Sequence, residues 1–489
     1  MTLLRLLFYI AIIALVLTLL IGWWKKGHKS WLMTYLQNFT GVLFIISGLV
    51  KAIDPVGTAF KMEEYFTEFQ YAFADTWFGF MGPVFHYLSE ISLIFSVAMI
   101  VFEIILGLML LLGHKTKLTS WLFLLLVLFF TMLTGFTYLT GYVPSDATYF
   151  QFSKWGPYVV TNMRVTDCGC FGDFIKLVPK ISFFKDLALL IPAFIFVFRH
   201  KDMHQLFTAK TRNITIAIST VLLVIFCLNN FLWNLPVVDF RPFKVGTNIY
   251  DTREKEQAAA AAVKITAWRL KNLKSGEVIE IPDKQYMSEL AKYPKTEWAV
   301  VEQVKTKPEI EATKVSDFSI ADSEGNEVTE DILTDSGDVF LVVAYKLKGE
   351  SQTEEIMVPD TLWKVDTVQI KPDSAVLVKS IASAGTKKEV KTIYTWDPDY
   401  LKDYKEKVNP LMQDVMKQGA KVYAIAGGAG SDMENAFKEA IEGNYNWYEA
   451  DEVLLKTMIR SNPGVMHMKG GKVLEMWHIR HLPKSLKLN

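Results

Sequence analysis

Cysteine is scarce in this chain, with only three in 489 residues. They are Cys168, Cys170 and Cys227, so residues 228–489 contain none. This absence excludes a disulfide-stapled domain, and a zinc domain with cysteine ligands, from the second half of the chain. Net charge is also absent, because 52 Lys and Arg balance 52 Asp and Glu. A neutral chain without a basic patch predicts no nucleic-acid partner.

Long apolar runs are missing after about residue 235, whereas six of them precede it. Most approach the roughly 20 residues that a helix needs to cross a bilayer. The first run ends in a Trp pair and lysines instead of a small-residue cleavage site, so we interpret it as an anchor that stays in the chain. We expect transmembrane helices over about 3–24, 35–51, 90–113, 118–142, 181–198 and 214–235.

Positive charge gathers in three of the short connections between these segments. The residues are Lys25, Lys26, Lys29, Lys115, Lys117, Arg199, Lys201, Lys210 and Arg212. Such loops are typically cytoplasmic, which places the loops 52–89 and 143–180, and both chain ends, outside. The 143–180 loop also carries four basic residues, and the charge rule is weakest for long loops.

Aromatic residues crowd the outer loop that follows the second helix. They are Tyr65, Phe66, Phe69, Tyr71, Phe73, Trp77, Phe78 and Phe80. We expect a short amphipathic helix at the level of the lipid headgroups, where aromatic rings are favoured. A slot for a lipid or a quinone is the alternative.

The strongest local motif is Cys168-Gly169-Cys170, in the second outer loop. Two thiols one residue apart can form a small, strained disulfide, and strain makes a disulfide easier to reduce. The pair is therefore redox-active, a structural disulfide that pins the loop, or two reduced thiols without a role. No nearby cluster supplies further metal ligands, so we expect no metal. Cys227 is either a packing residue or a third thiol.

Glu103 lies in the middle of the third apolar segment. A carboxylate within the membrane is costly, so it is functional or paired. Two roles stay open for Glu103, namely a hydrogen-bonded carboxyl that locks helices together and a group that handles protons. Lys51, Asp54, Glu90 and Asp186 fall at the predicted outer ends of helices.

The second half changes character along its length. Residues 239–256 are expected to be a connector, and short strands near 263–304 predict a small β-rich module. From about 317, strands over 339–345 and 421–425 alternate with helices over 399–418 and 431–442, before a hairpin over 465–478. That order is typical of a thioredoxin fold, in which Pro463 has the place of a cis proline.

We divide the chain accordingly into four parts. These are a first helix with its loop (1–34), a membrane bundle (35–235), a connector with a β-rich module (236–310) and a thioredoxin-like α/β domain (311–489).

Three stretches carry a resemblance to the DoxX/MauE family: FIISGLVKAIDP at 44–55, the segment around Glu103 that ends in Leu111-Leu112-Gly113, and CGCFG at 168–172. Residues 315–485 resemble the thiol-disulfide oxidoreductase and peroxiredoxin branch of thioredoxin folds. Together they resemble DoxX-type proteins of Bacteroidetes-like bacteria. This resemblance implies an inner-membrane protein with a periplasmic C-terminal domain.

MauE proteins act with a periplasmic thioredoxin-like partner to mature a disulfide-rich dehydrogenase subunit in methylamine use. By resemblance, Cys168 and Cys170 would be the membrane-side thiol pair. The chain departs from the pattern after the strand ending at Tyr345, where Lys346-Leu347-Lys348-Gly349 replaces a CxxC motif and about 346–395 is inserted. Without a thiolate nucleophile, this domain is expected to dock or sense and not to exchange disulfides.

Three hypotheses follow. The protein is a membrane factor for thiol redox or maturation of envelope proteins, a non-enzymatic subunit of an envelope complex, or an accessory of a respiratory complex. A quinone is the only cofactor that we consider. The expected partners are membrane lipids and an envelope protein of unknown identity.

Overall fold

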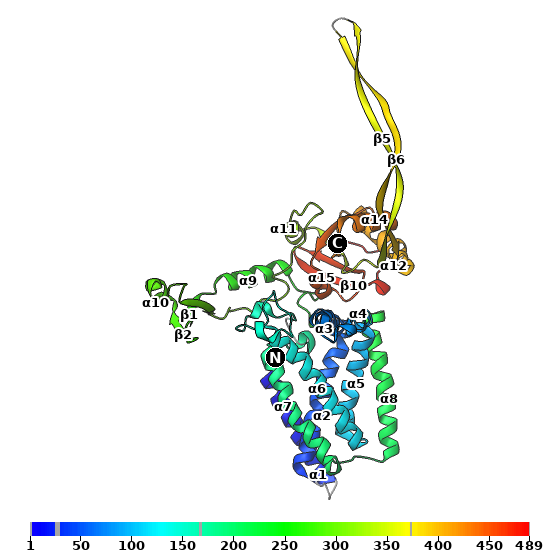
Figure 1. Cartoon of the computed structure of the whole chain (residues 1–489). Coiled ribbons are helices and arrows are strands. Elements are labelled where there is room, and N and C mark those ends of the chain that lie inside the picture. The colour runs from blue at the N-terminus through cyan, green and yellow to red at the C-terminus, as the bar shows by residue number, and fades with distance from the viewer. Residues whose placement is uncertain (1, 25–29, 166–168, 372–373, 489) are drawn as a thin grey trace.

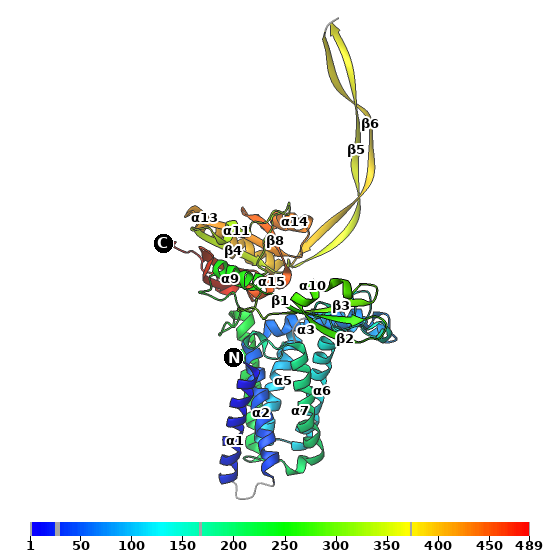
Figure 2. The same cartoon turned by 90° about the vertical axis from the view of Figure 1, so that its left-hand side faces the viewer.

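The chain folds into a helical bundle that carries a sheet-containing half at one end (Figure 1). This computed structural model describes residues 2–24, 30–165, 169–371 and 374–488. The sheet-containing half covers one end of the bundle, and a long β-ribbon projects from it away from the helices (Figure 1, Figure 2).

Among the described residues, six helices are long and apolar enough to cross a membrane, which confirms the predicted membrane half. They are α1 (Leu3–Trp24), α2 (Trp31–Ile53), α5 (Ser92–Leu112), α6 (Thr116–Thr140), α7 (Pro179–Arg199) and α8 (Ala209–Leu228). Helix α2 begins earlier than the expected residue 35, because the Ser30 side chain accepts a hydrogen bond from the Met33 amide and caps the helix.

Small residues let α2 and α5 pack closely. A Cβ atom added to Gly41 would lie 2.9 Å from the Gly107 carbonyl oxygen, and one added to Gly107 would lie 2.8 Å from the Gly41 carbonyl oxygen. Such close approach through small residues is how helices associate within a membrane. It also fixes which side chains of the two helices face each other farther along.

The loop after α2 forms a helix, α3 (Pro55–Ala74), followed by the short α4 (Gly82–Glu90). Helix α3 lies across the end of the bundle beneath the sheet-containing half (Figure 2). Its inner aromatic residues are buried in protein, with the Phe66 ring centroid 5.2 Å from that of Phe95 and the Phe69 centroid 4.9 Å from that of Phe136. Much of the aromatic loop therefore builds the core at this end of the bundle, whereas Tyr71, Trp77 and Phe80 stay exposed.

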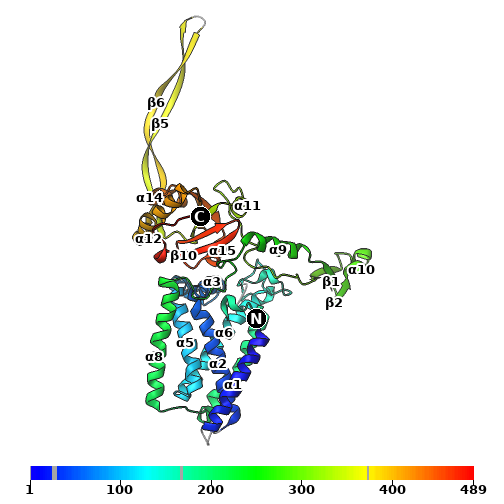
Figure 3. The ribbon, with the colours of Figure 1, turned by 180° about the vertical axis from the view of Figure 1, so that it is seen from behind.

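The ends of the bundle differ in what they carry. The α5–α6 connection and the α7–α8 connection lie at one end (Figure 3). The N-terminus, the loop containing α3, the α6–α7 loop and the sheet-containing half lie at the other (Figure 1, Figure 3). The two long loops and the C-terminal half thus share one side of the bundle.

A small β-rich module follows the bundle. Strands β1 (Ile265–Asn272), β2 (Val278–Pro282) and β3 (Trp298–Lys305) form an antiparallel sheet in the order β2-β1-β3. Part of the expected connector is instead helix α9 (Ile249–Ala261), because the Asn248 side chain caps it by accepting from the Asp251 amide.

The C-terminal sheet has five strands in the order β10-β9-β4-β7-β8. Strands β4 (Asp338–Ala344), β7 (Lys421–Gly427) and β8 (Asn446–Ala450) are parallel, and β9 (Gly464–Lys469) and β10 (Lys472–His478) are antiparallel. Successive side chains of β4 alternate between the faces, so Phe340 and Val342 enter one buried core and Leu341 enters another.

Helices flank this sheet. The expected helix over 399–418 is α12 (Pro398–Asp403), continuing through a π-helical turn (Tyr404–Val408) into α13 (Asn409–Lys417). Helix α14 (Ser431–Ile441) matches its expected range, whereas β8 and α15 (Glu452–Met458) were not predicted. The Asn462–Pro463 peptide bond is cis.

The inserted stretch forms a two-stranded antiparallel ribbon of β5 (Gly349–Lys371) and β6 (Ser374–Trp396). It projects from the domain on the side away from the bundle (Figure 1, Figure 2). At its base, the Trp396 ring lies 4.8 Å from that of Phe437 in α14, which anchors the ribbon in the domain core.

Candidate functional site

The close contact between α2 and α5 places Lys51 opposite Glu103. The Lys51 Nζ atom lies 2.6 Å from Glu103 Oε2, and both side chains are buried. The Lys51 ammonium also lies 4.9 Å from the ring centroid of Phe130 on α6. A buried charge needs a partner, and Lys51 is the partner of Glu103 that the sequence alone did not identify.

A second charged pair lies near the start of α7. Lys185 Nζ is 2.5 Å from Asp186 Oδ1, and the Thr134 hydroxyl on α6 donates a 3.0 Å hydrogen bond to Asp186 Oδ2. The Lys185 ammonium also lies 3.8 Å from Cys170 Sγ. The second pair is therefore in direct contact with the thiol.

The backbone around Cys170 is held by the bundle. The Ser47 hydroxyl on α2 donates a 3.0 Å hydrogen bond to the Cys170 carbonyl oxygen. Gly169 has a φ of +58°, a left-handed conformation that favours glycine. Cys168 lies outside the described residues, so the predicted pairing of Cys168 with Cys170 stays a prediction.

Two small cavities border both the thiol and the charged side chains. One, of about 30 Å³, is lined in part by Lys51, Glu103 and Cys170. The other, of about 20 Å³, is lined in part by the same three residues together with Lys185 and Asp186. Each has room for about one or two water molecules. Burial raises the pKa of the Cys170 thiol, and the Lys185 ammonium opposes this rise.

Cys227 occupies a different setting. It is buried in α8 and belongs to an apolar cluster with Ala52, Ile100 and Ile104. This is the environment expected of a cysteine that serves packing.

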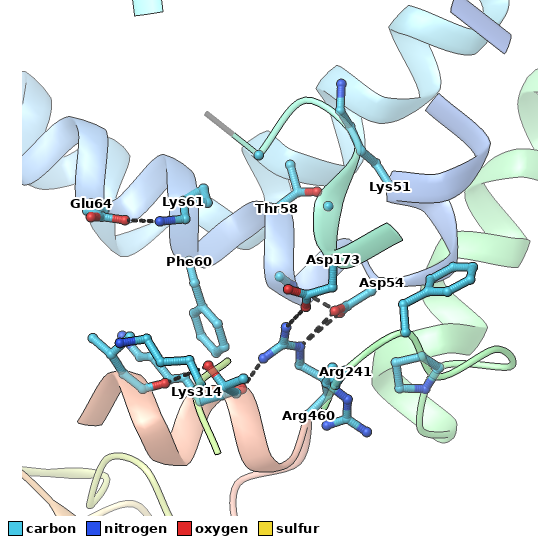
Figure 4. Close-up of a pocket in the computed structure, with 18 of the residues that line it drawn as sticks. Lys51, Asp54, Thr58, Phe60, Lys61, Glu64, Asp173, Arg241, Lys314 and Arg460 are labelled. Atoms are coloured by element: carbon cyan, nitrogen blue, oxygen red, sulfur yellow. Dashed lines mark hydrogen bonds and ion pairs between the residues drawn. The ribbon is translucent and has the colours of Figure 1, made fainter. Parts of the chain in front are cut away.

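Arg460 joins the sheet-containing half to the bundle (Figure 4). Its Nε atom lies 3.0 Å and 2.9 Å from the two carboxylate oxygens of Asp54, and its Nη2 atom lies 3.5 Å from Asp173 Oδ2. Its Nη1 atom donates to the Lys456 carbonyl oxygen. Asp54 also accepts a hydrogen bond from the Gly57 amide and caps α3. Asp54 thus ends α2, begins α3 and holds the C-terminal half in place.

A second set of contacts surrounds Phe60 of α3. Lys456 Nζ lies 4.7 Å from the Phe60 ring centroid and 3.3 Å from Glu63 Oε2, while the Tyr345 ring is 5.4 Å from that of Phe60. Burial there raises the pKa of Tyr345 to about 12. Helix α15 and the end of β4 therefore rest on α3.

The turn with the cis peptide bond lies next to the end of β4. The Asn462 amide donates a 2.6 Å hydrogen bond to the Lys346 carbonyl oxygen, and the Tyr400 hydroxyl donates to Asn462 Oδ1 at 3.2 Å. Pro463 and the segment after β4 are thereby tied together, close to the seam between the two halves.

A cavity of about 550 Å³ runs along this seam. Gly169, Gly172 and Asp173 line it from the bundle loop, and Arg241, Lys456 and Arg460 line it from the C-terminal half. Segment 169–173 therefore has the buried charge pairs on its inner face and the seam cavity on its outer face.

The structure brings together Lys51, Glu103 and Cys170, which the sequence named separately. It also brings Asp54 to Arg460, a residue that the sequence analysis did not select. Lys185 was missed as well, although its position beside Asp186 near the start of an apolar helix was a usable signal.

Residues 29–145 match the family model described as methylamine utilisation protein MauE. The matched segment contains Lys51, Asp54 and Glu103 and ends before Cys170. The chain matches no curated protein and no solved structure. The similarity to MauE thus covers part of the membrane half, and the six apolar helices fit a multi-pass membrane protein.

Proposed function

We propose that this protein is an inner-membrane accessory factor for thiol redox or maturation of envelope proteins. Cys168 and Cys170 are its working pair, and the C-terminal half is its docking module. The observation that carries this proposal is the placement of Cys170 against Lys185 and beside the Lys51–Glu103 pair, next to the seam. The MauE match supports an accessory role in a system like methylamine utilisation.

The chemistry needs a thiolate, which is the nucleophile in disulfide exchange. A thiolate of the pair attacks a client disulfide and forms a mixed disulfide, releasing one client thiolate. The second cysteine then attacks the mixed disulfide and releases the other client sulfur. Two electrons pass to the client, the pair ends as a disulfide, and the reverse sequence oxidises a client dithiol.

The C-terminal half has the properties of a docking module and lacks those of an exchange enzyme. The order of the strands in its sheet and the helices packed on both faces of that sheet support a thioredoxin-like domain. It contains no cysteine, so it cannot attack a disulfide. The ion pairs of Arg460 with Asp54 and of Lys456 with Glu63 hold it on α3, and Arg460 also reaches Asp173 in the loop that contains Cys170.

The location is part of the proposal. The α5–α6 and α7–α8 connections contain Lys115 and Lys201, and the first turns of α6 and α8 contain Lys117 and Lys210. Such positive charge favours the cytoplasmic side. The opposite end, with Cys170 and the C-terminal half, then lies in the periplasm. Disulfide chemistry with envelope proteins requires that oxidising side.

An alternative function is that of a non-enzymatic subunit of an envelope or respiratory complex. The pairing of Glu103 with Lys51 favours it, because holding two helices together is a sufficient role for a buried ion pair. The projecting ribbon of β5 and β6 also favours it, since a scaffold needs a surface that reaches other proteins (Figure 1).

The test replaces both Cys168 and Cys170 by Ser and measures the thiol redox state of envelope proteins by differential alkylation and mass spectrometry. We expect a defined set of proteins to change its redox state while the variant keeps wild-type abundance in the membrane. Cys227→Ala is the matched control and should leave the pattern unchanged. An unchanged pattern in the double variant would remove the redox function and leave the subunit alternative.

A further inference from the structure

Four charged side chains surround Cys170 from three helices. Lys185 and Asp186 belong to α7, Lys51 to α2 and Glu103 to α5, and all four line one cavity with the thiol. The side chains of Lys51, Glu103 and Asp186 are buried, and that of Lys185 is 14% exposed. Lys61 of α3 packs on the outer side, where a Cβ atom at Gly169 would lie 3.2 Å from its Cγ.

These four charges cancel in pairs. Each ammonium group lies within 2.6 Å of a carboxylate oxygen, so the set has no net charge while the cysteine is a neutral thiol. A thiolate would add one negative charge to a region where charge is weakly screened. The thiolate therefore depends on the nearest cation, Lys185, and is opposed by the two carboxylates.

We propose, building on the thiol function proposed above, that Lys185 is the positioning residue for the Cys170 thiolate. In this proposal the four charged side chains form a balanced set that controls how easily the thiol ionises. When the S–H bond breaks, the proton leaves to solvent water, so the sulfur carries the added negative charge. The sulfur is then held by the Lys185 ammonium until it attacks a client disulfide.

This proposal predicts whether each change of charge favours or disfavours the Cys170 thiolate, and we call this prediction the rule of sign. Removing a positive charge from the set should disfavour the thiolate, and removing a negative charge should favour it. Removing one whole ion pair should leave the balance nearly unchanged. A purely structural role for the same side chains predicts no such order, because any of these changes would loosen the same loop.

The experiment uses the full-length chain with Cys168→Ser and Cys227→Ala, so that Cys170 is its only cysteine. The rate of alkylation by iodoacetamide, in which a C–S bond forms and iodide leaves, is followed against pH in detergent-solubilised protein. The midpoint of the pH profile reports the ionisation of Cys170, independently of how accessible the sulfur is.

We expect Lys185→Met to raise the midpoint by about one pH unit, which is about a tenfold lower rate below the midpoint. Lys185→Arg should restore most of the parent profile. Asp186→Asn and Glu103→Gln should lower the midpoint. The double variant Lys51→Met with Glu103→Gln should have a midpoint close to that of the parent. Lys180→Met, at an exposed position of α7, is the matched control for Lys185→Met and should leave the midpoint unchanged.

The proposal is overturned if Lys185→Met leaves the midpoint unchanged, or if acidic and basic replacements move it in the same direction. Lys185→Arg and the double variant keep the charge balance, so they remain informative if a single neutral variant fails to fold. A midpoint that obeys the rule of sign while envelope redox patterns ignore the cysteines would reject the function proposed above and keep this inference.

Discussion

The two faces of segment 169–173 hold their charges in different surroundings. On the inner face, Lys51 with Glu103 and Lys185 with Asp186 are enclosed by helices, with space for about one or two waters per cavity. On the outer face, Arg460 meets Asp54 and Asp173 beside a cavity of about 550 Å³. Both faces use ion pairs, but only the outer pairs join two separate parts of the molecule.

This difference in surroundings gives the two faces different structural roles. A charge enclosed in the bundle cannot lose its partner without a large loss of stability, because the enclosing helices solvate it far less well than water would. A charge at the seam can be released into water when the two halves move apart. The inner face therefore fixes the bundle and surrounds the thiol, whereas the outer face sets how firmly the C-terminal half docks.

The largest effect is expected from Glu103→Ala. This change leaves Lys51 buried without a carboxylate, which should destabilise the bundle by about 3–5 kcal/mol. Thermal unfolding of the detergent-solubilised protein measures the loss. Lys51→Met combined with Glu103→Leu should recover most of it, because an apolar pair leaves no unpaired charge. Equal losses in the single and double variants would contradict the proposed importance of the pair.

Arg460→Ala should loosen the seam and leave the bundle intact. Truncating one partner of a buried, hydrogen-bonded charge pair costs about 2–5 kcal/mol, here of docking free energy. Hydrogen–deuterium exchange should rise in α15 and α3 and stay unchanged in α5 and α6. Arg480→Ala, at an exposed position of the same half, is the control. Unchanged exchange in α15 would show that Arg460 does not hold the halves together.

Acid should weaken the same seam through His478. Its Nε2 atom lies 3.2 Å from the Phe231 carbonyl oxygen, in the π-helical segment Asn229–Trp233 that follows α8, and burial lowers the pKa of His478 to about 4. Burial favours the neutral imidazole, and the hydrogen bond to the Phe231 carbonyl only partly opposes this effect. The stability that the buried neutral ring contributes is therefore present above about pH 6.5 and is lost as pH falls toward 4.

This acid effect should be smaller than that of Arg460→Ala. Hydrogen–deuterium exchange at several pH values should show the β10 end loosening below about pH 6.5. His478→Gln should remove this part of the pH dependence. A pH dependence that persists unchanged in His478→Gln would assign it to another group.

The smallest effect is expected from Glu63→Gln. Its partner Lys456 is 3.3 Å away and also pairs with Glu452 at 2.8 Å, and the Glu63 side chain is 33% exposed. Partly exposed pairs contribute about 0–1 kcal/mol. The same exchange measurement should therefore barely change. A rise in exchange as large as that in Arg460→Ala would contradict the distinction between the buried Arg460 contacts and the partly exposed Glu63 contact.

The sequence predicted the membrane half well, because a helix in a bilayer must be long and apolar whatever it packs against. It also predicted the core strands β4, β7 and β9, whose apolar runs are local signals. The pairing of Arg460 with Asp54 was not predictable in this way, since 406 residues separate them and no local pattern links them. Strand β8 and helix α15 are short, so their local signals are weak.

The contact of Lys185 with Cys170 falls between these cases. Asp186 was recognised as a charge at a helix end, but only the fold shows that its neighbour contacts the thiol. The Lys51–Glu103 pair depends on the close crossing of α2 and α5 through Gly41 and Gly107, which a single sequence does not specify.

Trapping of mixed disulfides tests the central claim most directly. Cys168→Ser and Cys170→Ser are expressed separately, cells are quenched with acid and alkylated, and adducts are resolved without reductant. If the pair exchanges disulfides, one single variant should accumulate envelope proteins in adducts that dithiothreitol releases, and the double variant should show none. If neither single variant forms such adducts while both reach wild-type abundance in the membrane, the cysteines do not exchange disulfides with other proteins.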